Sequence, residues 1–158
     1  MTLTMTPLEA ISERLGTTEP WVDTGGVHWL SPGDMEVREL AKAMNELHAR
    51  FITITAYQLP GAEGFRLEYH WDLEGRLLGF GFNIAGSANE NAKIESIFDL
   101  IEAADWIERE VHEGFGIDFT GREYEPLLLR EGDTPGVNLR DAAPAKPAAG
   151  AAVQEAKQ

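Results

Sequence analysis

Three consecutive segments of this chain have the composition of β-strands and are joined by short connections. Residues 51–59 are rich in Ile and Thr, and residues 77–84 carry an apolar side chain at every second position. Residues 65–73 alternate throughout, because four polar or charged residues separate Phe65, Leu67, Tyr69, Trp71 and Leu73. This alternation is typical of an antiparallel strand with one buried and one solvated face. The segments therefore predict a mostly antiparallel sheet whose apolar face other elements must cover.

The segments before the sheet supply elements that can cover it. A capping box with proline at the first helical position predicts a helix over residues 7–15. A Gly25-Gly26 turn predicts a short hairpin within residues 21–30. Apolar residues at helical spacing predict a second helix over residues 32–49. The order of elements predicts an α+β fold, in which a mostly antiparallel or mixed sheet has helices packed on one face.

Two glycines stand on the predicted solvent face of the third strand. Gly79 and Gly81 cost stability there because they offer no side chain for packing. They either let another backbone approach closely or leave a poorly filled solvent face. They lie within a strand and do not open a helix, so they do not form a dinucleotide-binding motif.

Residues 105–121 predict an amphipathic helix followed by a short strand. At 100° per residue the apolar side chains fall on one face, and Asp105, Arg109 and Glu113 fall on the opposite face at the i,i+4 spacing of ion pairs. Gly114 and Gly116 end the helix, the second as a left-handed cap. A short helical turn is predicted to precede this helix over residues 94–100.

The letters of this segment resemble a family signature. From residue 106 they read W-I-E-R-E-V-H-E-G-F-G-I-D-F-T-G, which resembles the signature of the thirty-kilodalton subunit of respiratory complex I. That family also supplies a small subunit to membrane-bound, energy-converting nickel–iron hydrogenases. The matching residues are Trp106, Glu108, Arg109, Glu110, Glu113, Phe115, Gly116, Ile117, Phe119 and Gly121. Gly114 departs from the pattern, where an apolar residue is usual.

The resemblance implies a non-catalytic scaffold subunit of a membrane-associated electron-transfer complex. Such a subunit carries no cofactor and has no activity alone. It packs against a large hydrogenase-like subunit, beside a small iron–sulfur subunit. These partners would carry iron–sulfur clusters and either nickel–iron or quinone. Other subunits would hold the chain on the cytoplasmic side of the membrane. After Arg122 the sequence departs from the complex I pattern, which favours the hydrogenase branch of the family.

The signature residues themselves form the expected partner interface. Trp106 lies among polar residues of the helix, so either another part of the chain or another subunit must cover it. Glu108 and Glu110, with Arg109, either form charge-assisted bonds to the following loop or a partner, or lie on a solvated helix shoulder. The expected interface residues are Trp106, Glu108, Arg109, Glu110, Glu113, Phe115 and Gly116.

Composition restricts the other classes of function. With 27 acidic and 13 basic residues the net charge is −14, which opposes binding to nucleic acid or anionic lipid. The charge either keeps the surface soluble or guides docking to a basic partner. Residues 85–125 hold eleven acidic and three basic residues, more than half of the excess. No cysteine is present to bind an iron–sulfur cluster, and no apolar run approaches the ~18 residues of a membrane span.

Two rival interpretations remain open at this point. One is a free-standing small-molecule-binding or regulatory α+β domain. The other is an enzyme that uses carboxylates and His112, although a metal at Glu108 and His112 would need two further ligands. In each case residues 1–141 are predicted to form one domain, and the Ala/Pro-rich residues 142–158 a disordered tail.

Overall fold

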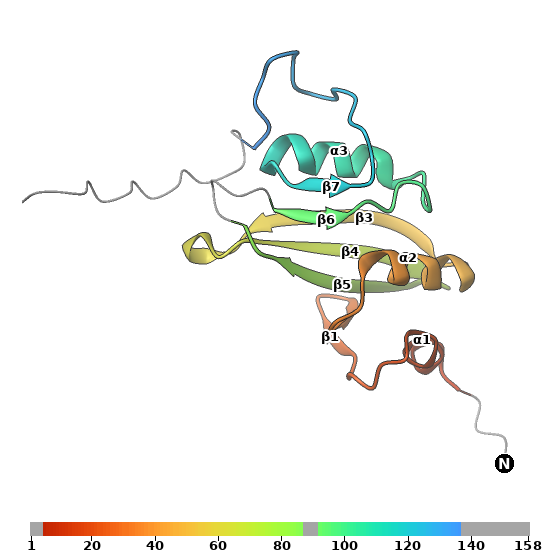
Figure 1. The fold of residues 1–158 in the computed structure, drawn as a ribbon. Helices are drawn as coiled ribbons and strands as arrows, with labels where there is room; N and C mark the ends of the chain where they lie inside the picture. The colour runs from red at the N-terminus through yellow and green to blue at the C-terminus, as the bar shows by residue number, and fades with distance from the viewer. Residues whose placement is uncertain (1–4, 87–91, 137–158) are drawn as a thin grey trace, which may run out of the picture.

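The computed structural model describes residues 5–86 and 92–136 (Figure 1). The elements in chain order are α1 (Pro7–Leu15), β1 (Val22–Thr24), β2 (Val27–Leu30), α2 (Val37–Glu46), β3 (Arg50–Gln58), the 3-10 turn η1 (Pro60–Ala62), β4 (Phe65–Leu73), β5 (Arg76–Ile84), β6 (Lys93–Glu95), α3 (Ala104–Phe115) and β7 (Asp118–Thr120). The predicted tail and the domain boundary at residue 141 lie outside the described residues.

Five strands form the main sheet, in the order β1-β2-β5-β4-β3. The pairs β1–β2, β5–β4 and β4–β3 are antiparallel, whereas β2 and β5 are parallel. The hairpin β1–β2 turns at Gly25 and Gly26, which both have positive φ. The mixed, mostly antiparallel sheet is therefore confirmed, and the span predicted for β4 is correct at both ends.

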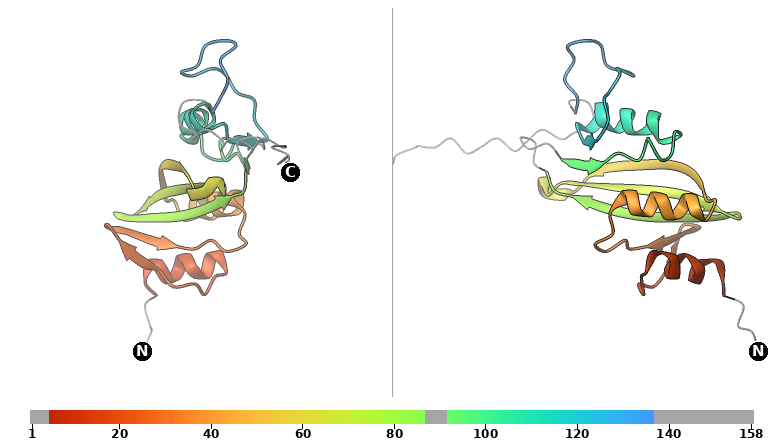
Figure 2. Two further views of the ribbon diagram at one scale, coloured as in Figure 1. Left: turned by 90° about the vertical axis from the view of Figure 1, so that its left-hand side faces the viewer. Right: turned by 45° about the vertical axis from the view of Figure 1, so that its right-hand side comes forward.

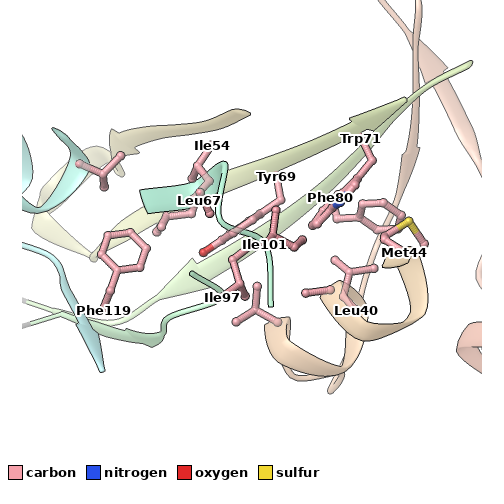
Figure 3. Close-up of a cluster of buried hydrophobic side chains, with 14 of the residues drawn as sticks. Leu40, Met44, Ile54, Leu67, Tyr69, Trp71, Phe80, Ile97, Ile101 and Phe119 are labelled. Atoms are coloured by element: carbon pink, nitrogen blue, oxygen red, sulfur yellow. The ribbon is translucent and has the colours of Figure 1, made fainter. Parts of the chain in front are cut away.

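One face of the sheet carries the hydrophobic core. Phe65, Leu67, Tyr69 and Trp71 of β4 are at most 1% exposed, and the residues between them are half-buried. Leu40 and Met44 of α2, with Ile97, Ile101 and Phe119 beyond the sheet, pack in the same cluster (Figure 3). Each helix contributes at least one buried residue to it. Figure 2 (right) shows α1, α2 and α3 following one another across the width of the sheet. The prediction of helices packed on one face is confirmed.

Two sequence-based predictions of local structure were wrong where their segments begin. A helical turn was predicted over residues 94–100, but Ile94 lies in β6 and pairs with Phe119 of β7 in a second, parallel two-stranded sheet. The turn forms only at the end of the segment, where the N–H groups of Leu100 and Ile101 donate to the carbonyl oxygen of Ile97. The helix predicted from residue 32 begins only at Val37. Gly33 has φ +59°, a left-handed conformation that cannot belong to a right-handed helix, so a turn precedes the helix instead.

Side chains cover the two glycines of β5. A Cβ atom on Gly79 would lie 2.6 Å from a ring carbon of Trp29, and one on Gly81 would lie against the guanidinium of Arg66. Trp29 in turn contacts the ring of His70 edge-on, with centroids 5.2 Å apart. The glycines therefore make room for long side chains on the open face of the sheet, and not for another backbone.

Candidate functional site

Helix α3 ends at Gly116 as its sequence predicts, whereas Gly114 lies within the helix and does not end it. Asp105 stands in its first turn, where a carboxylate is favoured by the helix dipole. Gly116 ends it in the left-handed conformation at φ 72°, and its N–H donates to the carbonyl of His112. Ala104 and Val111 face the core. After β7 the chain returns beside α3 as the loop of residues 121–136 (Figure 1).

Glu108 is fully buried, although it is charged. Its Oε2 accepts hydrogen bonds from the hydroxyl of Ser96 at 2.6 Å and from Nη1 of Arg122 at 3.0 Å. Its Oε1 accepts from the N–H of Ile97 at 2.8 Å. Burial raises the pKa of the Glu108 carboxyl, and these donors offset that rise only in part. The carboxylate is a structural centre that joins α3 to the segments before and after it.

Arg122 supplies the positive charge of this centre. Its side chain is 5% exposed and forms ion pairs with both Asp105 and Glu108. The guanidinium carbon also lies over the ring of Phe98, 4.8 Å from its centroid, in a cation–π contact. Burial alone would lower the pKa of Arg122, but the two carboxylates outweigh it and raise that pKa. Arg122, the residue that follows the signature, is thus bound to α3.

Arg109 holds the next stretch of the loop. Its Nη1 pairs with Asp105 at 3.1 Å, the i,i+4 ion pair that the sequence predicts. Its Nε and Nη2 donate to the carbonyl oxygens of Glu125 and Pro126, each at 3.1 Å. The interpretation that charge-assisted bonds from the helix hold the following loop is therefore confirmed for Arg109.

Glu113 binds the loop through three backbone groups. Its Oε1 accepts from the N–H of Leu127 at 2.7 Å, and its Oε2 from Leu128 at 2.7 Å and Leu129 at 3.1 Å. Burial would raise the pKa of Glu113, but the three N–H donors outweigh it and the pKa is lowered. The loop covers this side of α3, so Glu113 is 7% exposed although the helical pattern assigned it to the polar face.

His112 takes part in the same packing. Its Nδ1 lies 2.8 Å from the carbonyl oxygen of Ile117, and its ring stacks on Tyr124 with centroids 3.8 Å apart. Glu108 binds Ser96, Ile97 and Arg122 instead of joining His112. Among residues 5–86 and 92–136 no group of three or more His, Asp or Glu side chains is placed to hold a metal ion.

The seven expected interface residues therefore have different surroundings. Trp106 is 67% exposed and Glu110 is exposed, whereas Glu108 and Glu113 are buried within the chain. Arg109 is occupied by the loop, Phe115 packs edge-on against Phe65, and Gly116 caps the helix. Sequence reasoning missed Arg122 and the exposed Leu128, whose partners lie far along the chain and leave no local pattern.

A comparison with models of protein families identifies the family of this chain. The family model described as "Respiratory-chain NADH dehydrogenase, 30 Kd subunit" matches residues 34–148. The chain belongs to this family. The match includes α2, the sheet strands β3 to β5 and the whole of α3, so it extends well beyond the signature on which the resemblance rested.

Individual relatives agree with the family. The chain is similar to the NADH-quinone oxidoreductase subunits C of Rhodopseudomonas palustris strains BisB18 (29% identity over 89 residues, 56% of this chain) and TIE-1 (34% over 91 residues, 57%). It spans 44% of the length of each relative.

Two solved structures share the fold. One is a chain of the membrane-bound sulfane sulfur reductase, an archaeal respiratory membrane complex, with TM-score 0.67 and 21% identity over 84% of this chain and 79% of that one. The other is a trypsin-resistant fragment of Nqo5, with TM-score 0.56 and 22% identity over 75% and 98%. At these identities the likeness concerns the fold alone. Among the described residues of the present chain, no helix has the length and apolar character needed to cross a membrane.

Proposed function

We propose that this chain is a non-catalytic scaffold subunit of a membrane-associated electron-transfer complex, and that it packs against the large subunit of that complex. The family match over residues 34–148 carries the proposal. It is supported by the names of the relatives, which are subunits of NADH-quinone oxidoreductases. In this role the chain contributes a binding surface, and the redox centres belong to its partners.

The two kinds of surroundings on α3 suggest two roles for the expected interface residues. Trp106 and Glu110 are exposed and would contact the partner directly. Glu108, Arg109 and Glu113 bind the loop and the segment before the helix, so they would act by positioning the surface. Phe115 and Gly116 would act in the same way, through core packing and the helix cap.

The choice between the two branches of the family rests on the sequence after Arg122, which departs from the complex I pattern. We therefore place the chain in the branch of energy-converting nickel–iron hydrogenases, with a large nickel–iron subunit and a small iron–sulfur subunit as partners. The chain would lie on the cytoplasmic side of the membrane and be held there by those subunits.

An affinity pull-down tests this proposal. The tagged chain would be purified from its native cells in mild detergent and its partners identified by mass. Recovery of a large subunit with nickel-binding cysteines supports the hydrogenase branch, and recovery of quinone-oxidoreductase subunits supports complex I. Recovery of the chain alone, under conditions that keep known membrane complexes intact, would contradict the scaffold role. That result would favour a free-standing small-molecule-binding or regulatory domain.

Substitution of Trp106 by alanine is expected to weaken association with the large subunit by about 30-fold or more, because buried tryptophans dominate interface energies. Trp106 is 67% exposed in the isolated chain, so the melting temperature should hardly change. The measurements are retention of the large subunit and a thermal melt. Tyr57→Ala is the matched control, because Tyr57 is an exposed aromatic residue (41%) on the open face of the sheet. Equal loss in both variants would contradict the assignment of the interface to α3.

A further inference from the structure

Resting on the proposed scaffold role, we propose that the partner docks on one acidic face of this chain, and that the matching surface of the partner is basic around an apolar pocket. We call this surface the acidic docking face. It consists of Glu102, Trp106, Glu110, Glu123, Glu125 and Leu128, all of which are exposed. Three of them precede or belong to α3, and three belong to the loop that α3 holds.

Helix geometry and the hydrogen bonds of Glu113 place Trp106 and Leu128 on one side of α3. Positions 106 and 113 are seven residues apart, so they differ by only about 20° around the helix and by about 10 Å along it. Glu113 binds the backbone N–H of Leu128 at 2.7 Å. Leu128, 72% exposed, therefore lies at the end of the stripe that begins with Trp106, and the two large apolar side chains share that side.

The loop brings its carboxylates close to α3. Arg109 holds the carbonyl oxygens of Glu125 and Pro126 against α3, one turn beyond Asp105. Arg122 is bound to Asp105 and Glu108, which places Glu123 beside the first turns of the helix. The side chains of Glu123 and Glu125 are exposed, although their backbone is anchored.

On this side of the molecule, positively and negatively charged side chains differ in how deeply they are buried. The cations are turned inward, since the side chains of Arg109 and Arg122 are 13% and 5% exposed. The carboxylates of the face point outward, and within residues 5–86 and 92–136 no ion pair involves Glu102, Glu110, Glu123 or Glu125. Arg130 is exposed beyond Leu129, but Glu131 and Asp133 follow it. The outer layer is therefore strongly negative around two exposed apolar side chains.

The negative charge and the two apolar side chains of the acidic docking face limit which kinds of partner can bind it. Nucleic acid and anionic lipid surfaces carry negative charge and would be repelled. A second copy of this chain would carry the same net charge of −14. A protein surface with Lys or Arg around a pocket for Trp106 fits both the charge and the apolar side chains. The charges would guide the encounter, and Trp106 and Leu128 would provide the buried contact.

The test compares binding of the purified chain to the large subunit that the pull-down retains, by biolayer interferometry over about 0.05 to 0.5 M salt. Glu110→Lys is expected to weaken binding about tenfold at low salt and to flatten its salt dependence. Trp106→Ala should weaken binding at every salt concentration without changing that dependence. Glu39→Lys is the control, because Glu39 is another exposed helix glutamate, on α2, without an ion pair in the described part of the chain.

The outcomes separate this inference from the proposed function. Retention of the large subunit with no effect of salt or of Glu110→Lys would overturn the acidic docking face and leave the scaffold role standing. An equal effect of Glu39→Lys would likewise overturn it, since net charge alone would then explain the result. If wild-type chain binds no large subunit, the scaffold role fails and the inference fails with it.

Discussion

Arg122→Ala is expected to destabilise the fold by about 3–5 kcal/mol, the usual cost of removing one partner from a buried ion pair. Glu108 is fully buried, and Arg122 is the cation that binds it. Without the guanidinium, the charge of Glu108 would be compensated only by Ser96 and the N–H of Ile97. The measurement is the free energy of unfolding by chemical denaturation at neutral pH.

The pH dependence of this variant provides a second check. Burial already raises the pKa of Glu108, and loss of Arg122 should raise it further, above the value in the unfolded chain. The folded variant then binds the proton more tightly than the unfolded chain does. Its deficit relative to wild type should therefore shrink as the pH falls through the pKa of Glu108. Arg130→Ala, at an exposed arginine, is the control and should change stability by less than about 0.5 kcal/mol. A stability deficit that is small, or that grows as the pH falls, would show that Arg122 does not stabilise the buried carboxylate of Glu108.

Glu113→Gln is expected to release the loop from α3 at a cost of about 2–4 kcal/mol, because three hydrogen bonds to a charged acceptor are weakened together. The neutral amide has one carbonyl oxygen where the carboxylate offers two, and its NH₂ group would face backbone donors. Amide hydrogen exchange at Leu127, Leu128 and Leu129 should accelerate about a hundredfold. Exchange in β4 should change little if the opening is local.

The pKa of Glu113 predicts how the wild-type chain responds to acid. Burial opposes ionisation, but the three N–H donors lower the pKa below its ordinary value. The stabilisation is therefore fully present above the unfolded pKa and is lost as the pH falls through the lower, folded value. Protection of the three amides should decline in that acidic range. Glu110→Gln, at an exposed position of the same helix, should leave their exchange unchanged. Unchanged protection in Glu113→Gln itself would mean that packing alone holds the loop.

Local structure was largely predictable because its causes are local. The capping box of Thr6 and Glu9, the Gly25-Gly26 turn and the left-handed cap at Gly116 each depend on a few neighbouring residues. The alternation of β4 reflects one buried face, so its span was predicted correctly. The signature around Trp106 led to the family that the comparison then assigned.

The error at the start of the segment 94–100 shows where such reasoning ends. Ile94 forms a strand because its backbone pairs with β7, which follows α3 in the sequence. A pattern within the segment carries no information about a partner so distant in sequence. The helix predicted to start at residue 32 starts later for a local reason, because Gly33 has a left-handed conformation.

Chain order and side-chain periodicity thus determine where most helices and strands form and which face of the sheet is apolar. They do not determine the environment of the charges on α3. Periodicity placed Glu113 among solvated residues and Glu108 at a border, whereas the loop of residues 121–136 buries both. Burial depends on segments that meet only after folding, and burial decides whether a carboxylate binds the chain itself or faces a partner. Only the tertiary structure therefore separates the charges that hold the fold from those that remain outside with Trp106.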